Sequence, residues 1–442
     1  MDTPIVDFVR SYASSNTLRL HMPGHKGRGL LGVENLDITE IRGADSLYEA
    51  DGIIARSEEN ASWLFGCPTY YSTEGSSQCI RAMLHLAAQS ARQQGRVPRV
   101  AAARNVHKTF LSAVALLDLP VTWLYPKGQD SYLSCKLTAE ELDEALHGME
   151  EPPTAVYVTS PDYLGNLLDI RSLAKVCHRH GALLLVDIAH GAYLRFLTES
   201  LHPMDLGADL CCDSAHKTLP VLTGGAYLHT TPAFSPRMVK NALALFGSTS
   251  PSYLILQSLD LANVYLEDHS HRLEAFLPLV HRLKENLTAS GYVLAGQEPM
   301  KITIAAKPYG YTGDQLAEIL RQNKMECEFT DPDYLVLMLT PEINGFDLEK
   351  LKKTLCGLPQ KSPIGELPPV FVPAERCMGI REAMLCPGQW IPVEESEGCI
   401  LAAASVGCPP AVPILLCGER IDRHAIACFQ YYGIETVIIA AP

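Results

Sequence analysis

Lys217 is the residue whose type and setting best suit covalent chemistry on a carbonyl compound. It lies in the run Asp213-Ser214-Ala215-His216-Lys217-Thr218, directly after the apolar segment Leu210-Cys211-Cys212. A lysine just beyond a buried strand can lose its hydration, which favours the neutral, nucleophilic amine and suits imine formation. Most lysines are solvated surface groups, however, so this motif alone carries little weight.

Asp187 ends the apolar run Leu183-Leu184-Leu185-Val186. A carboxylate at that position is costly without a cationic partner. The protonated ring nitrogen of pyridoxal phosphate supplies such a partner, and the pairing makes the ring an electron sink. A strand-end aspartate that caps the next loop explains Asp187 about equally well. Asp187 and Lys217 together are more specific, because successive strands of one sheet bring both residues to one crevice.

Two further features suit the same cofactor. Gly75-Ser76-Ser77 precedes an amphipathic segment, and backbone N–H groups and serine hydroxyls at a helix start bind anions such as a phosphate. A plain serine N-cap is the simpler explanation. His107 follows the apolar segment Val100–Ala103 and could stack on a pyridine ring, although a structural histidine is an equal alternative.

The segments that must position these residues alternate between apolar runs and helical periods. Predicted strands are Val100–Ala103, Val121–Tyr125, Ala155–Thr159, Ala182–Asp187, Leu210–Cys212 and Ala226–His229, and predicted helices include Ser76–Arg92, Ala139–Leu146 and Ile170–His180. Fully apolar strands that alternate with helices indicate an α/β fold with a mainly parallel sheet between helices. Ligands on such sheets bind beyond the carboxyl ends of the strands.

Four regions are predicted along the chain. Residues 1–45 read as an extended N-terminal arm, 46–266 as the cofactor-binding large domain, 267–357 as a small α+β domain and 358–442 as a C-terminal module. A long helical stretch over 252–290 leads into the small domain, where strands Lys301–Ala306 and Tyr334–Leu339 flank a helix over Gly313–Asn323. The Pro-rich stretch 358–373 is typical of a linker.

Composition excludes several functions. The net charge is −14 over 442 residues, which disfavours nucleic acid and anionic membrane partners. The N-terminus resembles no signal peptide and the apolar runs are only strand-sized, so we expect a cytoplasmic protein without membrane spans. The fourteen cysteines are scattered and favour buried reduced thiols. No CxxC pair or HExxH helix occurs, so no metal site is predicted.

The chain resembles the ornithine/lysine/arginine decarboxylase family of fold-type-I pyridoxal-phosphate enzymes, in its shorter bacterial form. The resemblance runs almost from end to end. The matching segments are His21-Met22-Pro23-Gly24-His25-Lys26, Gly43-Ala44-Asp45, Gly75-Ser76-Ser77, Arg104-Asn105-Val106-His107-Lys108, Thr159-Ser160-Pro161, Asp187-Ile188-Ala189-His190-Gly191-Ala192, Ser214-Ala215-His216-Lys217-Thr218-Leu219, Arg381-Glu382-Ala383 and Pro409-Pro410-Ala411-Val412-Pro413.

The resemblance implies a role for each matching site residue. Lys217 would form the internal aldimine with pyridoxal 5'-phosphate, Asp187 would pair with the ring nitrogen, and His107 would stack on the ring. His190 would lie beside the ring. The phosphate would be held at the segment that begins with Gly75, by Ser76, Ser77, Ser214 and His216. Thr249, within Ser248–Ser252, would reach a neighbouring subunit's site, which implies a homodimer or larger homo-oligomer with shared active sites.

Some neighbours of these residues depart from the family pattern. Ile188 and Tyr193 stand where the family usually has an acidic residue and a histidine, and Pro220 and Gly224 follow the lysine in place of small residues and a glutamine. These positions surround the site without forming the cofactor bond. They leave open which substrate is used, and whether the reaction is altered.

The predicted reaction is decarboxylation of arginine, lysine or ornithine, a step towards polyamines. Lys217 or His216 would then protonate Cα. Glu328 and Asp331 match an acidic stretch of the family and are candidates for binding the substrate's side-chain cation, although a solvated acidic loop is the commoner case. Another pyridoxal-phosphate reaction (transamination or a lyase step) is the enzymatic alternative, and a non-catalytic regulatory relative is a further one.

Overall fold

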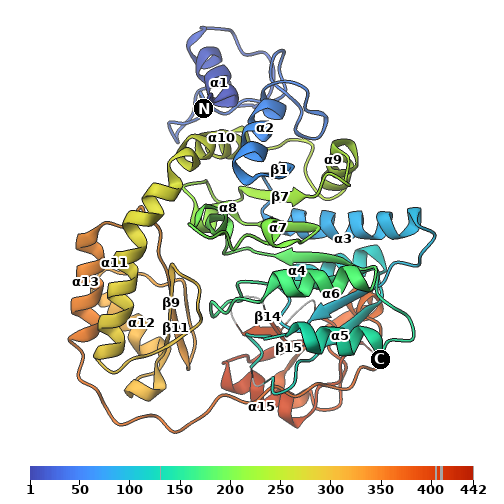
Figure 1. Cartoon of the computed structure of the whole chain (residues 1–442), viewed down its shortest axis with the longest axis vertical. Helices are drawn as coiled ribbons and strands as arrows, with labels where there is room; N and C mark the ends of the chain where they lie inside the picture. Colours follow the sequence, from blue (N-terminus) through green and yellow to red (C-terminus); the bar gives the residue numbers. More distant parts are fainter. Residues whose placement is uncertain (130, 404–405, 409–411, 442) are drawn as a thin grey trace. The chain divides into compact units, whose positions relative to one another are not determined.

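The computed structural model describes residues 1–129, 131–403, 406–408 and 412–441 (Figure 1). The chain divides into two compact units. The first unit comprises residues 1–96 and 183–274, and the second comprises residues 97–182 and 275–442. The lysine and aspartate of the predicted site both belong to the first unit.

The principal sheet has seven strands, which confirms the predicted α/β class. In the first unit the strand order is β1 (Thr69–Ser72), β7 (Ala226–Thr230), β6 (Leu210–Asp213) and β5 (Leu183–Asp187). In the second unit it is β4 (Ala155–Thr159), β2 (Val100–Ala103) and β3 (Val121–Leu124). β5 runs parallel to β6, and β2 runs parallel to both β4 and β3. β7 is antiparallel to β6 and to β1, so the sheet is mixed.

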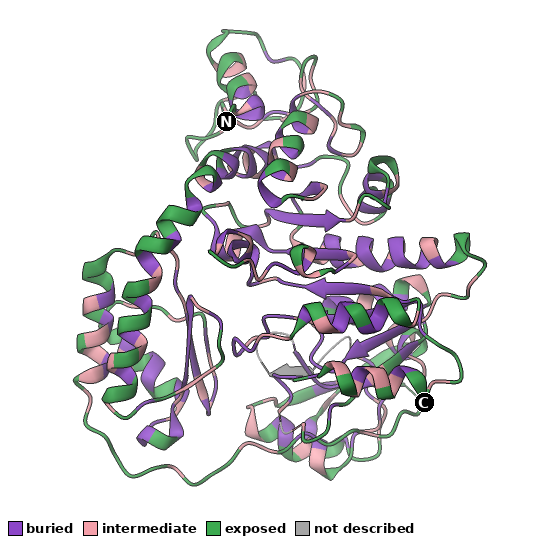
Figure 2. Ribbon diagram, viewed as in Figure 1, coloured by how far each residue is buried: buried purple, intermediate pink, exposed green. Residues whose placement is uncertain are grey.

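The strands of this sheet are almost uniformly buried, as Figure 2 shows. β5 is a run of Leu, Leu, Leu and Val before its aspartate, and β2 is Val followed by three alanines. Strands without polar alternation need cover on both faces, and helices supply it. The predicted strands therefore reappear with ends that shift by at most one residue.

Seven α-helices lie wholly in the described first unit: α1 (Pro4–Ser14), α2 (Ile53–Phe65), α3 (Ser76–Gln93), α7 (Pro203–Leu206), α8 (Ala215–Thr218), α9 (Pro236–Ala244) and α10 (Tyr253–Glu267). α1 corrects the prediction that the N-terminal stretch is extended throughout. Pro4 suits the first turn of a helix, and Ile5, Val6 and Val9 are buried. Helix α1 contacts α2 and α10, so this packing stabilises it.

The second unit adds α4 (Lys108–Leu117), α5 (Ala139–His147) and α6 (Ile170–Arg179), followed by a four-stranded antiparallel sheet. That sheet has the order β10 (Phe329–Thr330), β11 (Tyr334–Met338), β9 (Lys301–Ala305) and β8 (Val293–Ala295). The long helical stretch is two helices, α10 and α11 (His269–Ala289), and α12 (Gly313–Gln322) and α13 (Gly345–Cys356) follow it.

Residues 359–375 contain no helix or strand, and the part of the second unit that follows them is called the C-terminal module. Its elements are α14 (Ile380–Leu385), α15 (Arg423–Tyr431), β12 (Gly388–Pro392) paired with β15 (Thr436–Ala440), and β13 (Val406–Cys408) paired with β14 (Val412–Leu415). Residues 409–411 of the predicted Pro-rich match lie outside the described residues. None of the helices in the described part of the chain combines the length and hydropathy needed to cross a bilayer.

Two arginines of the matching motifs hold this module. The Arg104 guanidinium donates hydrogen bonds to the carbonyl oxygens of Pro413 (2.9 Å) and Ile414 (3.0 Å), and Arg104 is 2% exposed. Arg381 donates to the carbonyl oxygen of Ala115 (2.6 Å) near the C-terminus of α4, where the helix dipole favours a cation. The arginines of both motifs therefore make structural contacts within the second unit.

Candidate active site

Lys217 lies on the short helix α8, directly after β6. Its backbone N–H donates to the carbonyl oxygen of Ser214 (2.9 Å), which fixes the turn on which the side chain stands. The side chain is partly buried, and its Nζ lies 3.0 Å from Nε2 of His190. His190, for which a place beside the cofactor ring was predicted, thus directly contacts the side chain of Lys217.

Asp187 ends β5 and is 2% exposed. Its Oδ1 accepts a hydrogen bond from the backbone N–H of Ala189 (3.1 Å). In the parallel pairing of β5 with β6, Asp187 stands opposite Cys212. Asp187 and Lys217 therefore follow the carboxyl ends of neighbouring parallel strands, as predicted. Burial, and next the charge of Asp187, raise the pKa of the Cys212 thiol well above its ordinary value, so this thiol stays uncharged.

The N-terminus of α3 brings the serines of the predicted phosphate site together. Ser76 and Ser77 are the first two residues of the helix, and Gly75 precedes it with a φ of 71°. Ser214 Oγ donates to Ser76 Oγ at 2.9 Å. Hydroxyl groups from β6–α8 and from α3 therefore meet at a helix start, the arrangement that binds a phosphate.

A glycine pair after Lys217 connects α8 to this helix start. The N–H of Gly75 donates to the carbonyl oxygen of Gly224 (2.8 Å), and Nδ1 of His216 lies 2.9 Å from the carbonyl oxygen of Gly225. Gly224 has a φ of 100°, and a Cβ there would lie 3.1 Å from the carbonyl oxygen of Thr73. Sequence reasoning noted Gly224 only as a departure from the family, whereas the structure shows why a glycine is needed.

The other departures lie mostly in the interior. Ile188 and Tyr193 are fully buried, and Pro220 is exposed. An acidic side chain at the position of Ile188 would need a buried partner. The apolar isoleucine removes that need.

His107 and Thr249 occupy defined positions in their own units. His107 is the N-cap of α4, where its Nδ1 accepts from the backbone N–H of Thr109 at 3.2 Å. Thr249 is exposed, and the N–H of the preceding Ser248 donates to Glu74 Oε1 at 3.2 Å, one residue before Gly75. The stacking role of His107 and the subunit-bridging role of Thr249 stay predictions.

The two candidate substrate carboxylates differ in setting. Glu328 is exposed and its Oε1 accepts from the hydroxyl of Tyr163 at 3.0 Å. Asp331 is 4% exposed, and its Oδ1 accepts from the N–H groups of Asp333 (2.7 Å) and Tyr334 (2.6 Å). Burial raises the pKa of Asp331 to about 6. The alternative of a solvated acidic loop therefore fits Glu328 but not Asp331.

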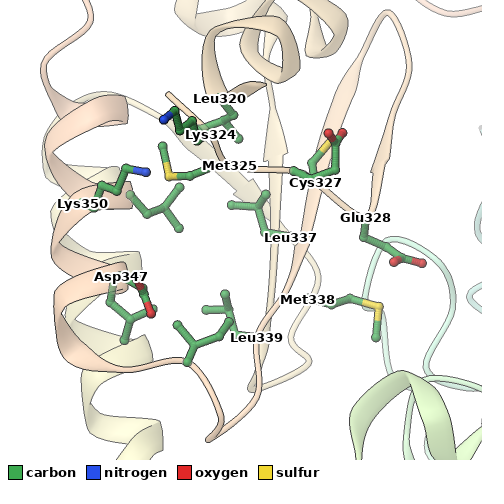
Figure 3. A pocket seen from close by; sticks show the side chains of 14 residues that line it. Leu320, Lys324, Met325, Cys327, Glu328, Leu337, Met338, Leu339, Asp347 and Lys350 are labelled. Carbon is green, nitrogen blue, oxygen red and sulfur yellow. The ribbon is translucent and has the colours of Figure 1, made fainter. Parts of the chain in front are cut away.

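Glu328 also borders a pocket of about 430 Å³ in the second unit. Figure 3 shows its carboxylate pointing away from Asp347 and Lys350 of α13, while Leu337 and Leu339 line the pocket between them. The pocket is thus apolar at its floor, with charged groups at its margin.

The first-unit residues fit pyridoxal phosphate. A helix start with converging serine hydroxyls suits the phosphate, and a buried strand-end carboxylate suits the ring nitrogen. A lysine beyond the adjacent strand suits the covalent attachment.

Comparison with known proteins identifies the family. The model of the family described as "Orn/Lys/Arg decarboxylase, major domain" matches residues 3–287, well over half of the chain. The chain belongs to this family. The Orn/Lys/Arg decarboxylases depend on pyridoxal phosphate and remove the carboxylate of basic amino acids, so the resemblance, the enzyme class and the cofactor of the family are confirmed.

Relatives within and beyond the family extend the match along the chain. An arginine decarboxylase of Bacillus subtilis is 28% identical, over 96% of this chain and 92% of its own length. An arginine decarboxylase of Halalkalibacterium halodurans is 27% identical over the same shares. The lysine decarboxylase structure of Francisella novicida superposes with a TM-score of 0.80 at 16% identity, over 99% of this chain and 79% of that one. A NifS-like protein superposes with a TM-score of 0.56 at 12% identity, over 81% of this chain and 95% of that one, which supports the fold-type-I architecture.

Proposed function

We propose that this decarboxylase acts on arginine and releases CO₂ and agmatine. The observation that carries the proposal is the similarity to curated arginine decarboxylases over 96% of the chain. In this reaction the carboxylate leaves Cα as CO₂, the electron pair stays behind, and a proton takes the place of the carboxylate.

Each site residue of the first unit would have a separate role in this reaction. Pyridoxal phosphate, when bound, supplies a conjugated ring that accepts the electron pair left by CO₂. Asp187 would hold a proton at the ring nitrogen, and the serines at the start of α3 would hold the phosphate. Lys217 would bear the cofactor between turnovers. His190, whose Nε2 lies 3.0 Å from Lys217 Nζ, would orient the amine.

The proton for Cα would come from Lys217 or His216. The two residues are consecutive on α8, and His216 is held by its contact with the carbonyl oxygen of Gly225. A positioned side chain that protonates the reacting carbon is general acid catalysis, which contributes on the order of 10²- to 10⁴-fold.

The guanidinium of the substrate would be bound by an acidic side chain. Between the two candidates we favour Glu328, since it is exposed and the hydroxyl of Tyr163 orients its carboxylate. Asp331 already accepts two backbone hydrogen bonds at one oxygen, and its burial opposes ionisation. Glu328→Gln should therefore raise the KM for arginine more than Asp331→Asn does.

A substrate panel tests the reaction. The purified protein with pyridoxal phosphate is given arginine, lysine or ornithine, and CO₂ and the amine product are measured. We expect CO₂ and agmatine in equal amounts from arginine and slower release from the other two. Keto acid without CO₂ would instead identify an aminotransferase. A protein that binds the cofactor but converts none of the three would fit the non-catalytic relative.

The attachment point is tested by reduction with borohydride, which fixes a pyridoxyl group on the lysine that holds it. The label should appear on Lys217 and vanish, together with turnover, in Lys217→Ala. Lys175→Ala, on the exposed side of α6, is the matched control and should keep both. An unchanged label in Lys217→Ala would show that another residue holds the cofactor.

We also propose a homodimer in which Thr249 completes the partner's site. Mixing inactive Lys217→Ala subunits with inactive subunits that lack the Ser248–Ser252 contacts should restore part of the activity, because one of the two mixed sites is then intact. No recovery in dimers shown to be mixed by mass would contradict shared sites.

A further inference from the structure

A second group of reactive side chains lies in the first unit, in addition to the residues assigned to the cofactor. Among the described residues, His202, Cys211 and His229 form a set whose potential metal-binding atoms all lie within 4.8 Å of one another. All three residues are fully buried. Neither the family nor the proposed reaction assigns them a role.

The fold holds these three side chains firmly. Cys211 on β6 and His229 on β7 stand directly opposite in the antiparallel pairing, so both point to the same face of the sheet. His202 precedes α7, and its Nε2 lies 3.9 Å from Cys211 Sγ. The rings of His202 and His229 meet edge to face with centroids 4.9 Å apart.

A second cysteine, outside this set of three, lies next to one of its histidines. Cys67 lies just before β1, and its Sγ is 3.9 Å from Nδ1 of His229. In a tetrahedral zinc site with Zn–S near 2.3 Å and Zn–N near 2.05 Å, sulfur and nitrogen lie about 3.5 Å apart. The two observed S···N separations of 3.9 Å exceed this by a few tenths of an ångström. Cys67 lies outside the group of mutually close donor atoms, so its side chain must also turn towards Cys211 and His202 before all four residues reach one ion.

An outer partner orients one histidine. Oδ2 of Asp213 lies 3.0 Å from Nε2 of His229, so Nδ1 is the nitrogen that faces Cys67. Histidine ligands of metals usually contact a carboxylate or carbonyl through their second nitrogen. Asp213 follows Cys211 by two residues and therefore lies on the same face of β6.

The charges of this set also suit a buried dication. Two thiolates and two neutral imidazoles neutralise Zn²⁺, and a neutral complex avoids the cost of an unpaired buried charge. As zinc enters, the two thiols each lose a proton to solvent, so charge and atoms balance.

An open pocket gives zinc access to this set, and two existing hydrogen bonds oppose its binding. Cys67 and Thr69 line an open pocket of about 910 Å³, which gives access from solvent. Binding would displace the hydrogen bond between Thr69 Oγ1 and His229 Nδ1 (2.9 Å) and the long one from Met204 N–H to His202 Nδ1 (3.4 Å). Both are hydrogen bonds between uncharged groups, which are much weaker than zinc–thiolate coordination.

We propose that His202, Cys211, His229 and Cys67 bind a structural zinc ion. The ion would tie β6, β7 and the start of β1 together, and β6 leads directly to Lys217. The four ligands come from separate places in the sequence, which is why spacing motifs predicted no metal.

Zinc content tests the proposal on the full-length protein. After incubation with zinc and removal of loosely bound ions, we expect about one zinc per chain, as in a closed structural site. Cys211→Ser and His202→Gln should lose it, and Cys67→Ser should weaken it in a chelator competition. Cys177→Ser, a buried cysteine of α6, is the matched control and should retain zinc. A zinc-free wild type, or full retention in Cys211→Ser, would overturn the site.

Cobalt substitution gives a readout that needs no variant. Co²⁺ bound by four S and N ligands shows thiolate charge-transfer absorption in the near ultraviolet and strong tetrahedral bands in the visible. Added zinc should abolish both. A weak spectrum of octahedral cobalt, without charge transfer, would show that the cysteines are not ligands. Because this measurement uses the wild-type protein, it tests the zinc site even if one of the variants fails to fold.

Discussion

Nζ of Lys217 lies 3.0 Å from Nε2 of His190, and the two residues follow the carboxyl ends of the neighbouring parallel strands β6 and β5. The contact places an imidazole where it can orient the amine and exchange a proton with it. His190 is buried, so it has little freedom to turn away. This contact directly links the residues that follow β5 with those that follow β6.

We expect His190→Ala to lower kcat by on the order of 10²-fold while leaving the cofactor bound, since the imidazole positions the lysine and does not hold the phosphate. Borohydride labelling of Lys217 should persist, and His190→Gln, which retains a polar group, should recover part of the rate. The exposed His147→Ala serves as control. A kcat equal to that of the wild type in His190→Ala would show that the contact has no catalytic consequence.

The hydrogen bond between Ser214 and Ser76 makes a prediction about cofactor affinity. Each serine that contacts a phosphate contributes a hydrogen bond to a charged group, so Ser76→Ala and Ser214→Ala should each raise the Kd of pyridoxal phosphate about tenfold. Because the two hydroxyls contact each other, the double variant should lose less than the product of the single effects. Titration of the apoprotein followed by cofactor absorbance measures these values. Ser90→Ala, near the other end of α3, should bind normally.

Substitution of Gly224 should destabilise the protein by more than the strain that a positive φ alone causes. Gly95 has a φ of 70° with open space around it, so Gly95→Ala should cost about 1 kcal/mol of unfolding free energy. Gly224→Ala should cost clearly more, because its Cβ would also approach the carbonyl oxygen of Thr73. It should weaken cofactor binding too, since the Gly224 carbonyl holds the N–H of Gly75. Urea unfolding of the two variants compares the costs, and equal values would contradict the clash.

The local sequence pattern predicted most strands of the principal sheet, but it did not predict β1 at one edge. The strands from β2 to β7 are short apolar runs, and such runs are recognisable one at a time. β1 reads Thr-Tyr-Tyr-Ser and shows no apolar run. It is stabilised from a distance: the hydroxyl of Tyr71 is fully buried and bonds to Ser57 and Asn263, which belong to α2 and α10. Partners so far apart in the sequence leave no local signal.

The site shows the same division. Lys217, Asp187 and the serines of α3 could be chosen as candidate site residues from the sequence, because each lies at a recognisable strand end or helix start. Their contacts could not, since the distance between Lys217 and His190 depends on how β5 and β6 pair. The cluster around His229 was not predicted, because the pairing of β6 with β7 and the position of His202 before α7 bring together residues that are separated in the sequence.

Arg104 makes a prediction about the C-terminal module. Its buried guanidinium bonds to two carbonyl oxygens of 413–414 and lies 3.9 Å from Glu419. Arg104→Met would leave both carbonyl oxygens without the guanidinium donor and the buried Glu419 carboxylate without this cationic partner, although the N–H of Leu416 still donates to Glu419. The loss should cost about 3–5 kcal/mol. Arg381→Met removes a half-exposed side chain and should cost about 1 kcal/mol. Unfolding free energies and protease sensitivity of the module measure both, and equal losses would contradict this ranking.

Asp260 should make the fold less stable as the pH rises from 4 to 6. Its Oδ2 accepts from the N–H groups of Ile5 and Val6, both at 3.0 Å, and burial raises its pKa from 3.8 to about 6 against these bonds and the one from Ser57. The folded protein then holds more protons than the unfolded chain in this window, so raising the pH favours unfolding. Asp260→Asn keeps an acceptor for α1 but cannot ionise. Its unfolding free energy relative to the wild type should therefore rise between pH 4 and 7 by on the order of 2 kcal/mol. Asp51→Asn, an exposed control, should show no such rise, and a pH-independent difference for Asp260→Asn would contradict the argument.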